Sequence, residues 1–251
     1  MKLEEKNVIV TRSYKKVYQC NEGIVKVFEP EHPKANVFNE ALNQARIEET
    51  GLPVPKVKEV TQVEGKWALV MTCIEGNTLA EVMDKDSKHM DDYMNQFVTL
   101  QLEMHEKQAP LLTKLKDKLT REINSLKELD ATARYELLTR LDAMPKHSKV
   151  CHGDFNPSNV IVGKDGKLAI IDWAHATQGN ASADAAMTYL LFALKDQKMA
   201  DHYMEVFCKK SDTAKQYVQQ WLPIVAASQL TKDNELEKEF LMKWIDVFDY
   251  Q

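Results

Sequence analysis

The chain has 251 residues, and 44% of them are hydrophobic, which is enough apolar material for one large domain or two modest ones. A formal net charge of -5 argues against a general nucleic-acid binder, because such a protein needs a basic surface to displace counterions from phosphates. The sequence contains no apolar run of membrane-spanning length and no signal-peptide core, so neither membrane insertion nor secretion is expected. The four cysteines are scattered without a C-x-x-C pair, which favours a reducing cytoplasm over a zinc site or a disulfide framework.

Short β-type runs separated by turn signals dominate the first part of the chain. The predicted strands are Asn7–Val10, Lys16–Cys20, Gly23–Phe28, Lys56–Val63 and Lys66–Met71. One helix interrupts them over Asn36–Gly51, where apolar residues recur at helical spacing and a glycine follows. This pattern predicts a small antiparallel sheet with a single helix.

Long amphipathic segments follow and predict a mainly helical second part. The predicted helices are Asp91–Ala109, Leu112–Leu129, Ala131–Ala143, Ala183–Leu194, Lys198–Cys208, Thr213–Leu230 and Leu236–Phe248. The exception is Asn159–Asp172, where two alternating runs joined by an Asp-Gly turn predict a β-hairpin. We place the boundary in the segment Thr72–Asn77, which gives an α+β chain with domains 1–73 and 74–251.

Three polar residues at fixed spacing frame this hairpin. Phosphoryl transfer needs a group that orients and deprotonates the acceptor hydroxyl, and oxygen ligands that hold Mg²⁺ against the triphosphate. Asp154 suits the first task as a catalytic base, and Asn159 and Asp172 suit the second as metal ligands. The alternative is structural, because Asp and Asn favour turns and strand ends whatever the function.

The stretches "HGDFNPSN" and "IIDW" resemble the aminoglycoside phosphotransferase and choline kinase family, the small-molecule branch of the protein-kinase-like fold. Further stretches that carry the resemblance are "IVKVF", "NEALNQA", "GLPVPKV", "MTCIEGNTL" and "LEMH". It implies a bilobal α+β fold in which 1–73 binds the nucleotide and 74–251 carries the catalytic loop and the acceptor site. ATP is the implied nucleotide, with GTP left open, and Mg²⁺ is the implied metal.

The resemblance also assigns roles in nucleotide binding. Lys26 would bind the α and β phosphates, Glu40 would hold Lys26 by an ion pair, and Met71 and Cys73 would contact the nucleotide from the hinge. Taken singly, Lys26 reads as an ordinary strand lysine and Glu40 as a surface glutamate.

One departure from many kinases lies in the first turn, "TRSYKK", which has no glycine. Where a glycine-rich turn brings backbone N–H groups to the phosphates, the candidates here are the side chains of Ser13, Tyr14 and Lys15. A solvated turn is the alternative. The resemblance implies that two further residues, His152 and Asp184, support the catalytic loop. The alternative for Asp184 is a cap for a helix beginning at Ala185.

The segment between Asp172 and Asp184 is short and no A-P-E sequence follows it, which favours a small-molecule acceptor over a protein. The resemblance places the acceptor against the C-terminal helices. Candidates there for binding a cationic amino sugar or a quaternary amine are Glu235, Glu239, Asp246, Asp249, Trp221 and Trp244, the alternative being solvated carboxylates and core tryptophans.

The predicted function is thus ATP-dependent phosphorylation of a hydroxyl on an aminoglycoside-, choline- or sugar-like molecule. The alternative is a catalytically silent nucleotide-binding regulatory module of the same fold. Nucleotide and acceptor are the expected partners, without nucleic acid or membrane, and the oligomeric state stays open.

Overall fold

The structure, a computed structural model, describes residues 3–21 and 23–245. The described residues form two compact units. The first unit comprises Met1–Lys85 together with Ser158–His175, and the second comprises Asp86–Pro157 together with Ala176–Gln251. The predicted division into 1–73 and 74–251 assigns each lobe one continuous stretch of chain, and it stays a prediction.

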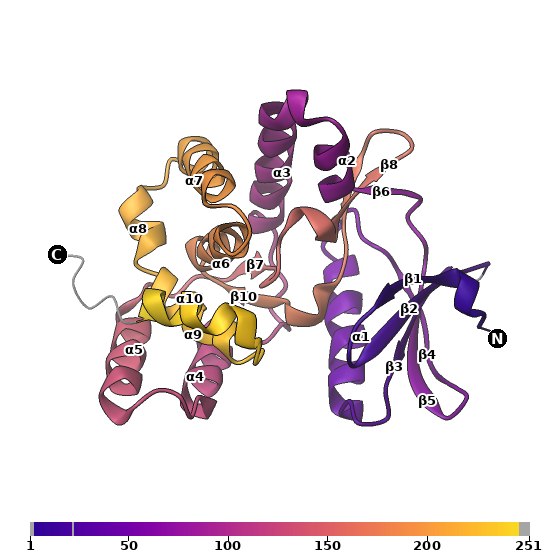
Figure 1. The fold of residues 1–251 in the computed structure, drawn as a ribbon, viewed down its shortest axis with the longest axis horizontal. Helices are drawn as coiled ribbons and strands as arrows, with labels where there is room; N and C mark the ends of the chain where they lie inside the picture. Colours follow the sequence, from indigo (N-terminus) through magenta and orange to yellow (C-terminus); the bar gives the residue numbers. More distant parts are fainter. Residues whose placement is uncertain (1–2, 22, 246–251) are drawn as a thin grey trace. The chain divides into compact units, whose positions relative to one another are not determined.

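A five-stranded antiparallel sheet forms the body of the first unit, with strand order β1-β2-β3-β5-β4 (Figure 1). Its strands are β1 Val8–Thr11, β2 Lys15–Cys20, β3 Gly23–Phe28, β4 Val57–Val63 and β5 Lys66–Met71, preceded by the 3₁₀ turn η1 Glu5–Asn7. The helix α1, Lys34–Glu48, packs on one face, where Val37 and Ala41 meet Phe28 and Leu69. The predicted sheet with one helix is confirmed.

A second, three-stranded sheet with order β6-β8-β9 belongs to the same unit. Its elements are β6 Gly76–Thr78, the helix α2 Leu79–Lys85, the 3₁₀ turn η3 Pro157–Asn159, β8 Val160–Gly163, β9 Leu168–Ile170 and the 3₁₀ turn η4 Trp173–His175. The predicted hairpin of β8 and β9 is confirmed. We did not predict β6, which is too short to show alternation; its Gly76 lies where a Cβ would come within 2.0 Å of the Val162 carbonyl oxygen.

The second unit is mainly helical. Its elements are η2 Ser87–His89, α3 Met90–His105, α4 Leu115–Ser125, α5 Ala131–Ala143, β7 Lys149–Cys151, β10 Thr177–Gly179, α6 Ala181–Ala193, α7 Gln197–Ser211, α8 Lys215–Gln219, α9 Leu222–Leu230 and α10 Glu235–Ile245. The strands β7 and β10 pair antiparallel. In the described part of the chain, no helix has both the length and the apolarity needed to cross a membrane.

One helix prediction in this unit was wrong, and another was too long. The predicted helix Thr213–Leu230 is two helices, α8 and α9, because Pro223 has no N–H to continue α8 and occupies the first turn of α9. The predicted helix Leu112–Leu129 is only Leu115–Ser125, followed by an extended residue at Leu126. The α+β class, with an antiparallel N-terminal sheet and a helical remainder, is confirmed.

Candidate active site

Lys26 lies on the face of the first sheet that α1 covers. Side chains alternate along a strand, so Lys26 shares its face with Phe28, whereas Val25 and Val27 pack into the opposite cluster. Lys26 Nζ donates a hydrogen bond to Glu40 Oε1 of α1 at 2.5 Å, and each of the two side chains is 8% exposed. The structure thus brings these two predicted residues together as a buried ion pair.

Asp172 reaches the same lysine from the end of the hairpin. Lys26 Nζ donates to Asp172 Oδ1 at 2.6 Å, and Lys15 Nζ lies 3.4 Å from Asp172 Oδ2. Lys15 is buried because it pairs with Phe28 across β2 and β3, which puts its side chain on the α1 face too. The sequence reasoning missed this contact, although the alternation of Lys15 with Val17 at the start of β2 signals the shared face.

Asn159 and Asp172 stand at the open end of the hairpin. The Ile171 N–H donates to the Asn159 carbonyl at 2.9 Å, which fixes the register there. Asp172 has φ 65°, a left-handed conformation that is uncommon for a residue other than glycine and is concentrated at functional sites. Asn43 of α1 donates to the Ala174 carbonyl at 3.3 Å and anchors the segment that follows. One rigid element therefore sets the positions of both predicted metal ligands.

The charges at this site hold one another in the ionised state. Burial alone would raise the pKa of Asp172, but the cations of Lys26 and Lys15 lower it well below its ordinary range. Burial would lower the pKa of Lys26, yet the charges of Asp172 and Glu40 raise it. Asp172 therefore offers a carboxylate, not a carboxylic acid, at neutral pH.

The donor chemistry of Asn159 and Asp172 fits Mg²⁺. Among the residues that the structure describes, no group of three or more His, Cys, Asp and Glu side chains could hold a metal ion by itself. Mg²⁺ does not need such a cage, because it usually binds one or two protein oxygens and completes its shell with water and phosphates. A carboxylate and an amide oxygen on one hairpin meet that requirement.

The other predicted nucleotide contacts lie in the same unit. The Met71 side chain is buried in the core, and its carbonyl lies so near Gly23 that a Cβ there would come within 2.1 Å. Cys73 Sγ accepts a hydrogen bond from Gln19 at 3.6 Å. Ser13 is exposed in the turn between β1 and β2. The contacts of the described residues do not bear on the roles of Ser13, Met71 and Cys73 in nucleotide binding, and these roles stay predictions.

The predicted catalytic loop belongs to the second unit, where hydrogen bonds to buried side chains hold its backbone. His152 is fully buried, and its Nδ1 accepts a hydrogen bond from the Asp154 N–H at 3.2 Å. Gly153 has φ 75°, which favours glycine, and its N–H donates to Asp184 Oδ1 at 2.7 Å. Asp184 Oδ2 lies 2.9 Å from His105 Nε2. The structural assignments of His152 and Asp184 agree with these contacts.

The alternative role of Asp184 as a helix cap is wrong. The helix α6 begins at Ala181, four residues earlier than the cap would require, and Asn180 is its N-cap. The Asn180 side chain accepts from the Ser182 N–H at 2.9 Å, so Asp184 is free of capping and supports the loop instead.

The buried carboxylate of Asp184 should make the free energy of unfolding fall in acid. Burial alone would raise its pKa, but the hydrogen bond and charge of His105 lower it below its ordinary value. A carboxyl whose folded pKa is depressed stabilises the fold above its unfolded pKa of about 3.9, and this contribution is lost as pH falls toward the folded value. We expect Asp184→Asn to be less stable at pH 7 and to lose less stability on acidification. Urea unfolding from pH 7 to pH 3 measures this.

The control is Asp117→Asn, which removes an exposed carboxylate of the same unit. It should follow the wild type throughout, because an exposed carboxylate contributes little to stability. Equal acid sensitivity of Asp184→Asn and the wild type would contradict the assignment.

Lys232 was not predicted, yet it lies beside the predicted base. Its Nζ is 3.6 Å from Asp154 Oδ1. The residue follows α9, where its N–H donates to the Gln229 carbonyl at 3.0 Å. Nothing local in the sequence signals this contact, because a lysine between two helices is usually solvated.

The predicted acidic acceptor residues have partners of their own. Glu235 Oε1 lies 3.6 Å from Lys238 Nζ, and Glu239 Oε1 lies 2.9 Å from Lys243 Nζ, both within α10. These are exposed pairs on one helix, as the solvated alternative predicts. The two remaining acidic candidates, Asp246 and Asp249, lie outside the described residues.

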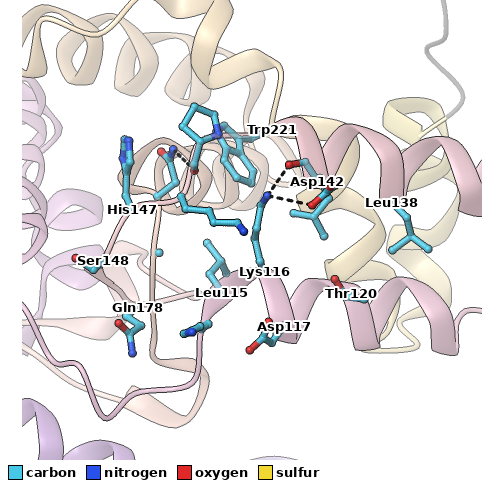
Figure 2. A pocket seen from close by; sticks show the side chains of 16 residues that line it. Leu115, Lys116, Asp117, Thr120, Leu138, Asp142, His147, Ser148, Gln178 and Trp221 are labelled. Atoms are coloured by element: carbon cyan, nitrogen blue, oxygen red, sulfur yellow. Dashed lines mark hydrogen bonds and ion pairs between the residues drawn. The ribbon is translucent and has the colours of Figure 1, made fainter.

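The two predicted tryptophans are packed against protein. Trp244 packs edge-on to Tyr189 with ring centroids 6.0 Å apart. Trp221 is 1% exposed and lies at the wall of a cavity of about 530 Å³, next to α4 and α5 (Figure 2). Lys116 at this wall donates to the Asp142 carbonyl at 2.7 Å. The basic residues that line the cavity are Lys114, Lys116, Lys146 and His147, against the acidic Asp117 and Asp142. This lining does not favour a cationic ligand.

Comparison with known proteins identifies the family. The sequence pattern of the phosphotransferase enzyme family matches residues 12–217. The chain belongs to this family. This phosphotransferase is therefore a small-molecule kinase, and its protein-kinase-like fold is shared with solved structures of that class. No curated protein matches the phosphotransferase significantly in sequence.

Solved structures support the same fold. A thermostable mutant of aminoglycoside phosphotransferase APH(4)-Ia without ligand has a TM-score of 0.71 and 14% identity, over 96% of this chain and 92% of that one. A mutant of the same enzyme with ADP and hygromycin B has a TM-score of 0.67 and 12% identity, over 95% and 89%. The choline kinase LicA from Streptococcus pneumoniae has a TM-score of 0.66 and 14% identity, over 96% and 93%.

Proposed function

We propose that this phosphotransferase transfers the γ-phosphate of ATP to a hydroxyl of a small molecule, with Asp154 as the catalytic base and Asn159 and Asp172 as Mg²⁺ ligands. The observation that carries the proposal is the contact of Lys26 with both Glu40 and Asp172, at 2.5 and 2.6 Å. A phosphate-binding lysine and a metal-binding carboxylate must meet the same triphosphate, so they must lie close together.

In the proposed mechanism, the first unit holds the nucleotide. Lys26, kept charged and oriented by Glu40, binds phosphate oxygens, and Asp172 and Asn159 would hold the metal ion. Mg²⁺, when bound, neutralises charge on the phosphates. ATP is the proposed nucleotide, with GTP as the alternative, and the APH(4)-Ia structure with ADP and hygromycin B supports a nucleotide and a hydroxyl-bearing acceptor as ligands. A cytoplasmic location would supply the nucleotide.

In the second unit, Asp154 accepts the hydroxyl proton of the acceptor. The hydrogen bond from the Asp154 N–H to His152, and that from Gly153 to Asp184, fix the backbone on which this carboxylate stands. General-base catalysis depends on such positioning, because the base must lie within hydrogen-bond reach of the proton that it removes.

A thermal-shift series tests the metal site. Ligand at about 100 times its Kd stabilises by roughly 2.7 kcal/mol, and for a chain of this size that corresponds to roughly 5–10 °C in Tm. We expect ATP to raise Tm substantially more with Mg²⁺ than with EDTA. Asp172→Ala should lose most of this metal-dependent increment, because it removes the charged ligand, while the apo variant stays folded by circular dichroism.

The matched control is Asp165→Ala in the turn of the same hairpin, where Asp165 Oδ2 forms an exposed ion pair with Lys167 at 3.3 Å. This variant should keep the full increment. An equal increment in Asp172→Ala and the wild type would rule out Asp172 as a metal ligand and favour the silent module.

A further inference from the structure

The predicted base has a lysine as its neighbour. Lys232 Nζ lies 3.6 Å from Asp154 Oδ1, and the two side chains are 34% and 25% exposed, so both are open to a ligand. The end of α9 sets the position of Lys232, since its N–H donates to the Gln229 carbonyl. Any acceptor whose hydroxyl reaches Asp154 must therefore also approach the ammonium group of Lys232.

A second lysine lies close to the loop. Lys118 of α4 lines a small cavity together with Gly153 and Ser228, and its side chain is 18% exposed. Burial lowers the pKa of Lys118, while Glu122 and Asp154 oppose this effect. The neighbourhood of Asp154 thus contains two lysines.

The carboxylates near these lysines are already engaged. Glu122 Oε1 lies 3.9 Å from Lys118 Nζ, and Glu122 Oε2 accepts a hydrogen bond from the Ser228 hydroxyl at 2.6 Å. Asp184 contacts His105 and the Gly153 N–H. In contrast, the carboxylate that pairs with Lys232 is Asp154, which the reaction needs as its base. When Asp154 binds the acceptor hydroxyl, an anionic group of the acceptor can take its place as the ion-pair partner of Lys232.

The electrostatics disfavour a cationic acceptor here. Two like charges at contact distance repel each other, and near a protein surface water screens this repulsion only in part. An amine next to the reacting hydroxyl would meet that repulsion from Lys232, whereas an anionic group would be attracted by a similar amount. The acidic residues of α10 do not offset this effect, because Glu235 and Glu239 already pair with lysines.

We propose that Lys232 binds an anionic group of the acceptor, so that the substrate is a small hydroxy compound carrying a carboxylate or a phosphate. This inference rests on the proposed role of Asp154. A hydroxyl about 2.6–3.2 Å from the base leaves room for roughly two to four carbon atoms between the hydroxyl and the anion. Lys232 is a positioning residue that also selects the substrate.

The chemical step leaves Lys232 unchanged. The acceptor oxygen forms the new bond to the γ-phosphorus, and the bond from that phosphorus to the β–γ bridging oxygen breaks. Its electron pair leaves with ADP, and the hydroxyl proton passes to Asp154. Lys232 contributes binding of the anion, which should appear mainly in KM.

Matched acceptors test the inference. One series keeps the carbon chain and changes the charge, namely 4-hydroxybutyrate, 1,4-butanediol and 4-amino-1-butanol; a second compares D-glycerate, glycerol 3-phosphate and glycerol, and separates carboxylate from phosphate. ADP release is measured at constant ionic strength. We expect an anionic member to exceed its neutral analogue at least tenfold in kcat/KM. Lys232→Met should raise KM for it about 10- to 100-fold and remove the preference.

The control variant is Lys238→Met, which removes a lysine of α10 that pairs with Glu235 and Glu128. It should keep both the rate and the preference for the anion. A preference for the neutral or the amino compound, or an unchanged anion preference in Lys232→Met, would overturn the inference while the phosphotransferase activity stands.

Binding without turnover separates the two proposals. Asp154→Asn removes the charged partner of Lys232. Calorimetric titration with D-glycerate and with inorganic phosphate should therefore show at least about tenfold tighter binding to this variant than to the wild type. The double variant Asp154→Asn/Lys232→Met should lose this gain in affinity. Anion binding that depends on Lys232, with no compound phosphorylated, would support the anion site and overturn the proposed reaction. If no anion is either bound or phosphorylated, the inference is overturned.

Discussion

Asp154→Asn is expected to lower kcat by about 10²- to 10⁴-fold, the usual loss when a general base is removed. ATP affinity should change little, because Lys26 and Asp172, which would bind the nucleotide and its metal, lie in the first unit and are untouched. The asparagine keeps the size of the side chain and the backbone hydrogen bond to His152, so the loop should keep its shape. Steady-state kinetics with an identified acceptor, together with the thermal shift by ATP, separates turnover from binding.

The matched control is Asp142→Asn, which replaces an aspartate of the second unit whose side chain is 91% exposed. Its kcat should equal that of the wild type. A near-normal rate for Asp154→Asn would remove this residue from the role of base, whereas parallel losses in both variants would indicate a general effect on folding.

Lys26→Met is expected to lower the free energy of unfolding by about 3–5 kcal/mol, because removing one partner of a buried ion pair leaves the other charge uncompensated. Here the effect falls on Glu40 above all, since its side chain is 8% exposed and Lys26 is its cation. Asp172 keeps Lys15 at 3.4 Å. Urea unfolding followed by circular dichroism measures the loss, which is large against the 5–15 kcal/mol typical of folded domains.

A surface pair in the same sheet supplies the control. Lys66 Nζ lies 2.5 Å from Glu29 Oε2, but the two side chains are 38% and 30% exposed, so Lys66→Met should change stability by about 1 kcal/mol or less. The double variant Lys26→Met/Glu40→Leu should recover part of the loss, since it removes both charges. Similar losses for Lys26→Met and Lys66→Met would show that burial does not govern the strength of these pairs.

The sequence predicted those elements whose signal is local and repeated over several residues. The alternation in Gly23–Phe28 and the Asp-Gly turn at Asp165 are such signals, and both the strand and the hairpin are confirmed. The pairing of β6 with β8 was not predicted, because three residues carry no period and their partner is distant in sequence. Pro223 was a local signal for the break between α8 and α9, and the continuous apolar pattern of Thr213–Leu230 concealed it.

At the candidate site, too, local signals were found and contacts between distant residues were missed. Residue type and spacing led to Asp172, and the family resemblance led to Lys26 and Glu40; the structure brings all three together around Lys26. The contact between Lys15 and Asp172 depends on the register of β2 against β3, which spacing does not specify. Lys232 was missed because its place beside Asp154 follows from the packing of the helices of the second unit. Charge at a site is therefore harder to predict from sequence than the reactive groups themselves.

The composition of the first unit has a consequence for how the protein folds during synthesis. Its residues 158–175 emerge from the ribosome only after the whole of Asp86–Pro157. Until then β6 lacks its neighbour β8, and the Lys26–Glu40 pair lacks Asp172. Such contacts between distant parts of the chain raise the contact order and slow folding, because a long loop must close before they form. The three-stranded sheet β6-β8-β9 can therefore form only after residues 158–175 have been synthesised.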